Sequence, residues 1–407
     1  MRNRQLRRLV LRSYTLFFLF YLFGVLRVGA QNESDERALI AVEDGLSFSK
    51  DSLFLMNLRF RMQNRIGLQS LAGDDLNVGQ LDARVRRLRL RLDGFVFTQQ
   101  LQYYIQLSFS KADQELETGI IPQTIRDAVL YYTVNKHLYF GFGQAKLPGN
   151  RQRVISSGNQ QFADRSIANN ELTVDRDFGL FGYYTLPTSL GAFKLKAALT
   201  TGEGRGASPG DDGLAYTYRF EWLPTGDFKN AGDYSEGDIE REEQLKISLA
   251  AGYHKNERAR RTGGQLGLEL YEARNIGTFI ADAVLKYQGW AWSTEFLSRS
   301  TNNPLTFSAD SSNVRLVYEG YGLNSQMSYY TKSGLEYALR YSRLQPATSI
   351  SAYRLPTEEV WVGLNKYLNG HRIKMQWHAG YRWVNGNAAL SQGGNRWFTM
   401  FQVEFGI

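Results

Sequence analysis

Arginines at alternate positions are the first feature of this sequence that could carry chemistry. In residues 84–92, RVRRLRLRL, leucines alternate with Arg87, Arg89 and Arg91. A helix would scatter these side chains around its axis, whereas a β-strand places successive side chains on opposite faces. The run therefore predicts a strand with one apolar face and one cationic face. A soluble sheet would turn the arginines outward to water, and a membrane barrel would turn them into a water-filled lumen, with the leucines against lipid.

A second alternating run, FLMNLRFRMQNR at residues 54–65, carries Arg59, Arg61 and Arg65 on one face. The two runs are consecutive, so we expect a hairpin in which both sets of arginines lie close together. Like charges that face each other across strands are destabilising, so water, anions or carboxylates must offset the repulsion. Two interpretations stay open. One is a solvated wall braced by acidic loop residues such as Asp164, Glu171 or Asp175, and the other is a row that passes anions along a pore. In both, the arginine side chains are expected to face water.

A glycine-rich stretch, GFGQAKLPG at residues 141–149, is the third candidate. It lacks the GK[ST] ending of a phosphate-binding loop and no helical pattern follows it, so we reject that interpretation. As a strand, it turns Gly141 and Gly143 inward and leaves room for a loop that folds into the lumen. Lys146, Arg151 and Arg153 stand where that loop begins, and an inward fold would bring them to the constriction.

The other polar residues do not form the pattern of an enzyme or a metal site. The chain has no cysteine, which excludes thiolate ligands and cysteine nucleophiles. Of its four histidines, only His378 lies in mid-strand on the polar face. A hydrolase needs a His beside a Ser or Asp, and no His, Asp and Glu spacing repeats as metal ligands do. We therefore predict no catalytic residue, no metal and no cofactor. The acidic patch of Asp238, Glu240, Glu242 and Glu243 is interpreted as a solvated turn.

The elements that must position these residues are almost all strands. Segments with a period of two follow one another from residue 53 to the C-terminus, and no sustained helical period appears among them. The expected strands are residues 53–67, 85–96, 98–110, 126–134, 137–146, 177–186, 191–201, 214–223, 244–254, 277–287, 290–299, 314–331, 335–345, 358–367, 371–384 and 395–407.

The lengths of the connections distinguish a soluble sheet from a membrane barrel. Linkers after even-numbered strands are mostly very short, for example residues 135–136 and 288–289, whereas those after odd-numbered strands are longer. Outer-membrane barrels have short periplasmic turns and long external loops, and closure pairs every backbone group within lipid. Residues 224–243 are an exception, because they are long on the short side. We therefore predict an all-β fold, a transmembrane antiparallel β-barrel of sixteen strands.

The N-terminus indicates export. Residues 1–12 are basic, residues 16–26 are apolar, and Val28-Gly29-Ala30 offers small residues for cleavage. The apolar run is shorter than the roughly 20 residues that a spanning helix needs. We assign residues 1–30 to an export signal peptide, 31–52 to a short periplasmic lead and 53–407 to the outer-membrane barrel. Removing the six arginines of the signal lowers the formal net charge from +8 to +2, so no nucleic-acid partner is expected.

From about residue 84 onward the chain resembles the phosphate-selective porin O and P family of bacterial outer membranes. The resemblance rests on RRLRLRLDG, YYIQLSFSKAD, IRDAVLYY, LYFGFGQAKLP, FADRS, DRDFGLFGYY, ALTTGEGRG, EWLPTGD, ALRYSRL and VGLNKYLNGHRIKMQW, in family order. It implies a sixteen-stranded barrel, usually trimeric, with a basic lumen and an inward-folded third external loop, here residues 147–176. Gly149 replaces the family's phenylalanine after the proline, and the lysine-rich phosphate site of some members is not evident.

These features predict a porin of the bacterial outer membrane, a passive diffusion channel for small solutes that prefers phosphate-like or carboxylate anions. The expected partners are further copies in a homotrimer, small anionic solutes and outer-membrane lipid. The alternatives are a structural or partner-docking barrel, which would not conduct, and a barrel hydrolase that would depend on His378. The expected anion pathway comprises Arg59, Arg61, Arg65, Arg87, Arg89, Arg91, Lys146, Arg151 and Arg153.

Overall fold

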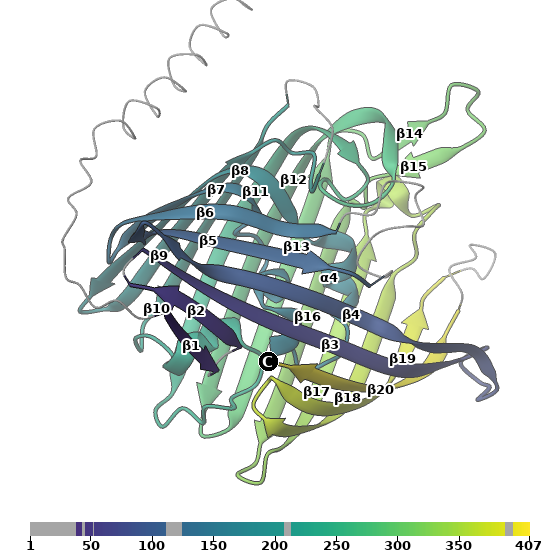
Figure 1. The fold of residues 1–407 in the computed structure, drawn as a ribbon. Coiled ribbons are helices and arrows are strands. Elements are labelled where there is room, and N and C mark those ends of the chain that lie inside the picture. The colour runs from purple at the N-terminus through teal and green to yellow at the C-terminus, as the bar shows by residue number, and fades with distance from the viewer. Residues whose placement is uncertain (1–37, 43–44, 52, 111–123, 207–212, 387–393) are drawn as a thin grey trace, which may run out of the picture. The chain divides into compact units, whose positions relative to one another are not determined.

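Sixteen antiparallel strands close into a barrel in the computed structural model (Figure 1). The structure describes residues 38–42, 45–51, 53–110, 124–206, 213–386 and 394–407. Neighbouring barrel strands pair along the chain, and β20 (Arg396–Gly406) pairs with β3 (Phe54–Ser70), which closes the barrel. The strands between them are β4 (Val78–Val96), β5 (Thr98–Ser108), β6 (Ile125–Asn135), β7 (Leu138–Lys146), β8 (Arg176–Thr188), β9 (Gly191–Thr200), β10 (Ala215–Leu223), β11 (Lys246–Arg261), β12 (Glu269–Tyr287), β13 (Trp290–Thr301), β16 (Gly320–Tyr330), β17 (Leu335–Pro346), β18 (Thr357–Asn369) and β19 (Ile373–Val384).

The predicted sixteen-stranded barrel is confirmed, but the single strand expected over residues 314–331 is wrong. Residues 314–316 form β15, which pairs with β14 (Leu305–Phe307) in a separate two-stranded sheet. The barrel strand β16 begins only at Gly320, whose φ of 139° is a conformation that residues with a Cβ rarely adopt. The β14–β15 hairpin belongs to a long connection, so the count of barrel strands is unchanged.

Two short strands precede the barrel. β2 (Leu46–Lys50) pairs with Phe54–Leu58 of β3, and β1 (Ala38–Val42) pairs with β2. The C-terminal Ile407 pairs with Phe60, so β2 covers the part of the β3 edge that β20 does not reach. Both strands lie within residues 31–52, the segment expected to be a periplasmic lead before the barrel. The sheet therefore starts before residue 53.

The period of two places polar and apolar side chains on opposite faces of each strand. In β10, Thr217, Arg219 and Glu221 are buried inside the barrel, whereas Tyr218 and Phe220 are exposed on the outside. This arrangement reverses that of a soluble sheet, because the apolar side chains point away from the molecule. It is the arrangement expected of a barrel whose outer face contacts lipid.

Most long and short connections lie at opposite ends of the barrel, as predicted, and residues 224–245 are the expected exception, a long connection at the short-turn end. The short turns include residues 136–137, 288–289 and 370–372, and the long connections include 302–319 and 347–356. Within the described part of the chain, none of the helices has the length and apolar character needed to cross a membrane.

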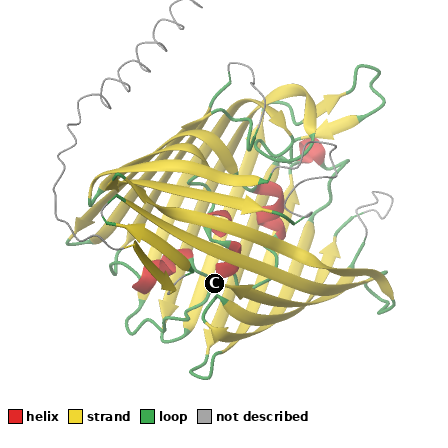
Figure 2. Cartoon of the chain, viewed as in Figure 1, coloured by secondary structure: helices red, strands yellow, loops and turns green. Residues whose placement is uncertain are grey.

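Two connections carry short helices inside the barrel (Figure 2). The third long connection, residues 147–175, which we call L3, holds α3 (Arg151–Val154), η2 (Ser157–Asn159) and α4 (Ile167–Leu172). Its inward fold is confirmed by the burial of its side chains against the inner strand faces. The other connection is residues 224–245, which we call the strap and which contains η3 (Lys229–Tyr234).

The strap contradicts the interpretation of its acidic residues as a solvated turn. Asp238 and Glu242 are buried, and Asp238 accepts hydrogen bonds from the backbone N–H groups of Gly289 and Glu242. Glu242 in turn accepts a hydrogen bond from the backbone N–H of Lys229. These two carboxylates hold the strap in shape, whereas Glu240 and Glu243 are exposed.

Candidate functional site

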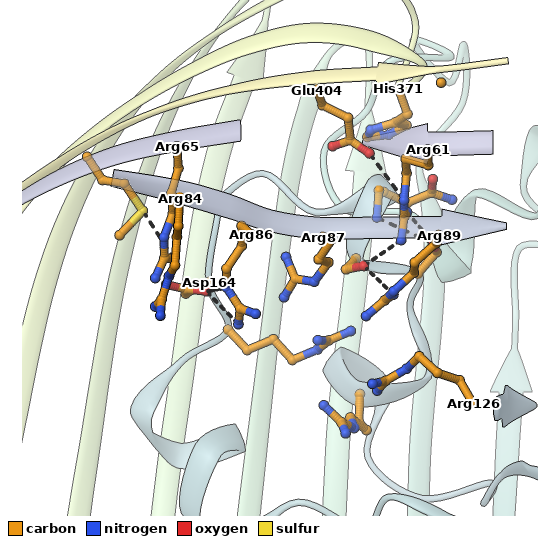
Figure 3. Close-up of a pocket in the computed structure, with 18 of the residues that line it drawn as sticks. Arg61, Arg65, Arg84, Arg86, Arg87, Arg89, Arg126, Asp164, His371 and Glu404 are labelled. Carbon is orange, nitrogen blue, oxygen red and sulfur yellow. Dashed lines mark hydrogen bonds and ion pairs between the residues drawn. The ribbon is translucent and has the colours of Figure 1, made fainter. Parts of the chain in front are cut away.

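The arginines of β3 and β4 lie opposite one another on the inner face. Arg59 pairs with Arg91 and Arg61 pairs with Arg89 in the register of the two strands, whereas Gln63 lies opposite Arg87. A β-bulge follows, because Asn64 pairs with Val85 and leaves Arg86 as an extra residue. The bulge shifts the alternation, so Arg84 and Arg86 turn to the same side as Arg87 (Figure 3). Strict alternation from Arg87 would have placed them outside.

These arginines line a cavity of about 1310 Å³ inside the barrel. Sixteen cationic side chains and five carboxylates of the described residues border it. The cations are Arg59, Arg61, Arg65, Arg84, Arg86, Arg87, Arg89, Arg91, Arg126, Lys146, Arg153, Arg165, Arg176, Arg205, Arg372 and Arg382. The carboxylates are Asp82, Asp164, Glu240, Glu359 and Glu404. A solute in this cavity therefore meets an excess of positive charge.

Eight of the nine residues predicted for the anion pathway border the cavity, and Arg151 does not. Arg151 is buried within L3, where its Nε lies 2.5 Å from Oδ1 of Asp282 and its Nη2 donates to Ser248. Its partners lie on β11 and β12, on the wall away from the arginines. Arg151 is thus an anchor of L3, a role that depends on a contact between residues far apart in the sequence.

The expectation that the arginines of β4 face water holds only in part. Arg87 and Arg89 are 3% and 8% exposed, because L3 covers them. Arg87 donates hydrogen bonds to Oε1 of Gln63 and to the backbone oxygen of Ala163, and Arg89 donates to Oγ of Ser157. Arg91 keeps 36% of its side chain exposed.

One carboxylate of L3 lies among the arginines. Asp164 accepts from Nη1 of Arg65 at 2.5 Å, and its other oxygen lies 3.2 Å from Nη2 of Arg86. Burial by itself would raise the pKa of Asp164, but the guanidinium groups of Arg86, Arg65 and Arg87 outweigh it and hold the pKa below its usual range. Asp164 is therefore ionised at neutral pH and offsets part of the repulsion between the arginines.

A second group of cations surrounds the start of L3. Nζ of Lys146 donates to the backbone oxygens of Val154 and Ile155, and Arg153 pairs with Asp175 at 2.5 Å. Gly141 and Gly143 of β7 face inward here, as expected. At Gly143 the backbones of β6 and β7 approach closely, because a Cβ there would lie 2.3 Å from the backbone oxygen of Ala128.

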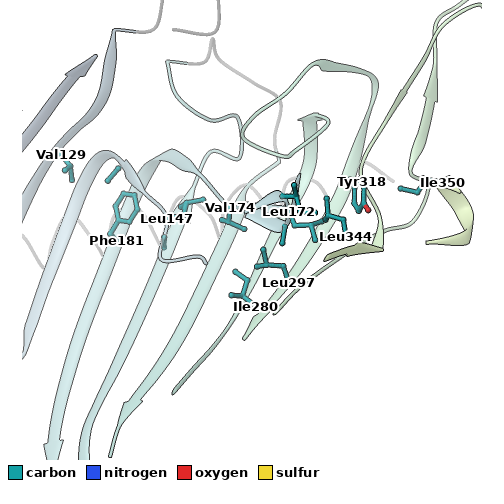
Figure 4. Packing of buried hydrophobic residues seen from close by; sticks show 14 residues of the cluster. Val129, Leu147, Leu172, Val174, Phe181, Ile280, Leu297, Tyr318, Leu344 and Ile350 are labelled. Atoms are coloured by element: carbon teal, nitrogen blue, oxygen red, sulfur yellow. The ribbon is translucent and has the colours of Figure 1, made fainter. Parts of the chain in front are cut away.

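Apolar packing holds the base of L3 against the wall (Figure 4). Leu147, Leu172 and Val174 of L3 pack in one buried cluster with residues of seven barrel strands, including Ile280 of β12 and Leu297 of β13. On the far side, Nζ of Lys374 donates to the backbone oxygens of Gly158 and Gln160. L3 therefore bridges the lumen and leaves the cavity on the arginine side.

Several residues that border the cavity were not predicted from the sequence. Arg126 is the extra residue of a β-bulge in β6, because its neighbours Ile125 and Asp127 pair with the consecutive residues Leu107 and Gln106. The bulge turns Arg126 inward, as the bulge in β4 does for Arg86. Arg165 and Arg205 lie in connections, where no period indicates a direction. Arg382 lies on the polar face of residues 372–382, so the alternation by itself could have identified it.

The known proteins that resemble this chain are porins. Residues 56–388 match the family model described as phosphate-selective porin O and P. The chain belongs to the phosphate-selective porin O and P family. It is a passive diffusion channel of the bacterial outer membrane, and it is not an enzyme.

Solved porin structures share the fold of this porin at low sequence identity. The anion-selective porin from Comamonas acidovorans superposes with a TM-score of 0.54 at 11% identity, over 87% of this chain and 100% of that chain. The trimer form of in-vitro folded OmpT of Vibrio cholerae gives 0.54 at 10% identity, over 87% and 100%. The channel DcaP of Acinetobacter baumannii gives 0.51 at 14% identity, over 89% and 100%. The comparison with curated proteins gave no match.

Two histidines of this porin have structural partners. His378 is buried, and its ring contacts the backbone oxygen of Gln161 and the side chain of Asn365. His371 lies 2.8 Å from Oγ of Ser235, but its other ring nitrogen faces Nζ of Lys374, a cation rather than the carboxylate of a catalytic triad.

Proposed function

We propose that this porin prefers anions over cations and passes phosphate-like or carboxylate solutes. The observation that carries the proposal is the composition of the cavity border, with sixteen cationic side chains against five carboxylates. Fixed charges of one sign raise the local concentration of counter-ions and exclude ions of their own sign. The effect weakens with salt, because the screening length falls to about 10 Å near 0.1 M.

The arrangement of the arginines suits successive transfer of an oxyanion. Arginine stays charged at physiological pH, and its planar fork binds an oxyanion through two parallel hydrogen bonds. Arg59 and Arg91 lie at one end of the β3–β4 hairpin wall, and Arg84 lies towards the other end. Because these three side chains are 32%, 36% and 48% exposed, they are the arginines of the wall that a solute can reach most directly.

The test changes these three accessible arginines together to Gln. We expect the anion-to-cation permeability ratio, obtained from reversal potentials across a salt gradient in a planar bilayer, to fall by about twofold or more, most strongly at low salt. The matched control changes Lys255, Arg260 and Lys332 to Gln, because these exposed cations lie outside the cavity border. Unchanged reversal potentials in the cavity variant would refute the anion pathway. A wild-type protein that inserts but does not conduct would instead indicate a structural or partner-docking barrel.

Assembly and export are further parts of the proposal. The Vibrio OmpT structure is described as a trimer form, and the family is expected to be trimeric, so we infer a homotrimer here. A trimer should migrate as a heat-sensitive species and conduct in three equal steps, whereas a single step would contradict it. Residues 1–30, which lie outside the described residues, are proposed to be a cleaved signal peptide. N-terminal sequencing of the mature protein should begin close to residue 31.

A further inference from the structure

The strap crosses the barrel close to its short-turn end. Near its start, Phe228 packs with Ala192, Leu223 and Val284 in a small buried cluster. Its middle part reaches the turn between β18 and β19, where Ser235 contacts His371 at 2.8 Å. Further along the strap, Asp238 accepts a hydrogen bond at 2.6 Å from the backbone N–H of Gly289, in the turn between β12 and β13. The strap thus joins separate parts of the short-turn rim.

Glu236 connects the strap to L3. Its carboxylate accepts hydrogen bonds from the backbone N–H of Gln161 at 2.8 Å and from Nε2 of Gln152 at 3.4 Å. Its own backbone N–H donates to the backbone oxygen of Asn159 at 2.9 Å. One strap residue, 5% exposed, therefore contacts L3 at three places.

L3 transmits this position to the arginine wall. Ser156 and Ser157 follow the first helix of L3 and contact Arg61. The Arg61 guanidinium donates hydrogen bonds to both hydroxyl groups. Gly158 approaches Arg61 so closely that a Cβ there would lie 2.2 Å from Nη1. The position of L3 therefore determines the orientation of Arg61. Glu236 holds L3 from the short-turn side.

The strap also borders the cavity at its short-turn end. Asn230 and Glu240 lie in the cavity border together with residues 369–372 of the β18–β19 turn. The strap and the β18–β19 turn therefore border the same cavity as L3 and the arginine wall.

We propose that the strap is a second constriction of this porin, at the short-turn end, and that Glu236 is the residue through which it positions L3. The inference rests on the proposed function, since it assumes that the cavity is the solute pathway. Conduction then depends on two narrow points in series, one made by L3 and one made by the strap.

The main experiment introduces a thiol at the proposed exit. The natural chain has no cysteine, so a single substitution Asn230→Cys gives one reactive site. Its matched control is Glu243→Cys, also in the strap, because the Glu243 side chain is 84% exposed and lies outside the cavity border. A bulky anionic methanethiosulfonate should lower the single-channel conductance of Asn230→Cys by about half or more, because the narrowest cross-section limits conduction. The same reagent should leave the current of Glu243→Cys unchanged.

A second measurement examines Glu236 as a positioning residue. Glu236→Ala removes both carboxylate hydrogen bonds, so we expect L3 to move, open-channel noise to increase and the reversal potential to change. Glu236→Asp should restore part of the wild-type behaviour, and Glu243→Gln removes a similar charge from the strap without touching L3. Heat-modifiable migration shows whether each variant forms a barrel.

The outcomes separate the two proposals. If wild-type protein is anion-selective but full modification of Asn230→Cys leaves its conductance unchanged, the strap is not a constriction and the inference fails. If Glu236→Ala folds and conducts like wild type, Glu236 does not position L3. A wild type without anion preference would overturn the proposed function, while block at Asn230→Cys would still support the second constriction.

Discussion

At the scale of single residues, the cation wall is compatible with folding because it is braced. Arg65 bonds both Asp82 and Asp164, Arg61 bonds two serines of L3, and Arg91 pairs with Asp93 at 2.7 Å. Hydrogen bonds to charged groups stabilise more than neutral ones, so these partners offset the repulsion between facing arginines. Several arginines of the wall are therefore braced by carboxylates and hydroxyl groups, whereas an anion pathway along the wall stays a prediction.

Asp164→Asn tests this balance. The substitution removes one negative charge from the cavity border while the amide oxygen keeps one acceptor for Arg65. We expect the anion-to-cation permeability ratio to rise at low salt, because the uncompensated positive charge increases. Asp310→Asn in the exposed β14–β15 hairpin is the charge-matched control. A fall in the ratio for Asp164→Asn would show that its chief effect is to hold L3 and the arginines in place.

The pKa of Asp164 also determines the expected response to pH. The unfolded chain protonates this carboxyl near its ordinary pKa of about 3.9, whereas the folded protein holds the pKa lower. The contribution of Asp164 to the docking of L3 is thus complete above about pH 4 and is lost as the pH falls through the folded pKa.

At the scale of elements, L3 and the strap act as an inner layer of the barrel. The base of L3 is held by apolar burial and its tip by hydrogen bonds to β3, β4 and β19. The backbone oxygens of L3 thereby find partners although the loop is buried, which is the condition for keeping an irregular segment inside a protein. Glu236 links the two loops, because its carboxylate accepts hydrogen bonds from Gln161 and Gln152 of L3.

Leu172→Ala should loosen this inner layer. Leu172 of L3 is fully buried against the wall. Truncation of such a leucine to alanine lowers the free energy of unfolding by about 2–5 kcal/mol. The barrel strands are paired independently of this side chain, so we expect assembly to persist while L3 becomes mobile. Single-channel records should show larger fluctuations in conductance. Leu190→Ala, at an exposed turn, is the control, and equal noise in the two variants would contradict the role of Leu172.

At the scale of the whole molecule, the separation of loop lengths predicts the orientation in the membrane. The long connections should face the outside of the cell and the short turns the periplasm, as in other outer-membrane barrels. An epitope inserted after Ser311, in the β14–β15 hairpin, should be labelled on intact cells. The same epitope after Ser333, in the turn between β16 and β17, should be labelled only after the outer membrane is permeabilised. The reverse pattern would invert the orientation.

The sequence by itself determined the class of fold, the number of strands and the face on which most side chains lie. These follow from local rules, because a period of two and the lengths of turns are legible residue by residue. It also identified most of the arginine wall, since Arg59, Arg61, Arg87, Arg89 and Arg91 obey that period.

Only the tertiary structure decided where the period breaks and what fills the lumen. The bulges at Arg86 and Arg126 depend on the partner strand, so no pattern within one strand reveals them. Other features depend on contacts between residues far apart in the chain. These are the burial of Arg87, the pairing of Arg151 with Asp282 and the docking of Glu236 on L3. Such contacts are set by how loops pack inside a closed wall, and that packing is not encoded in any local spacing of residue types.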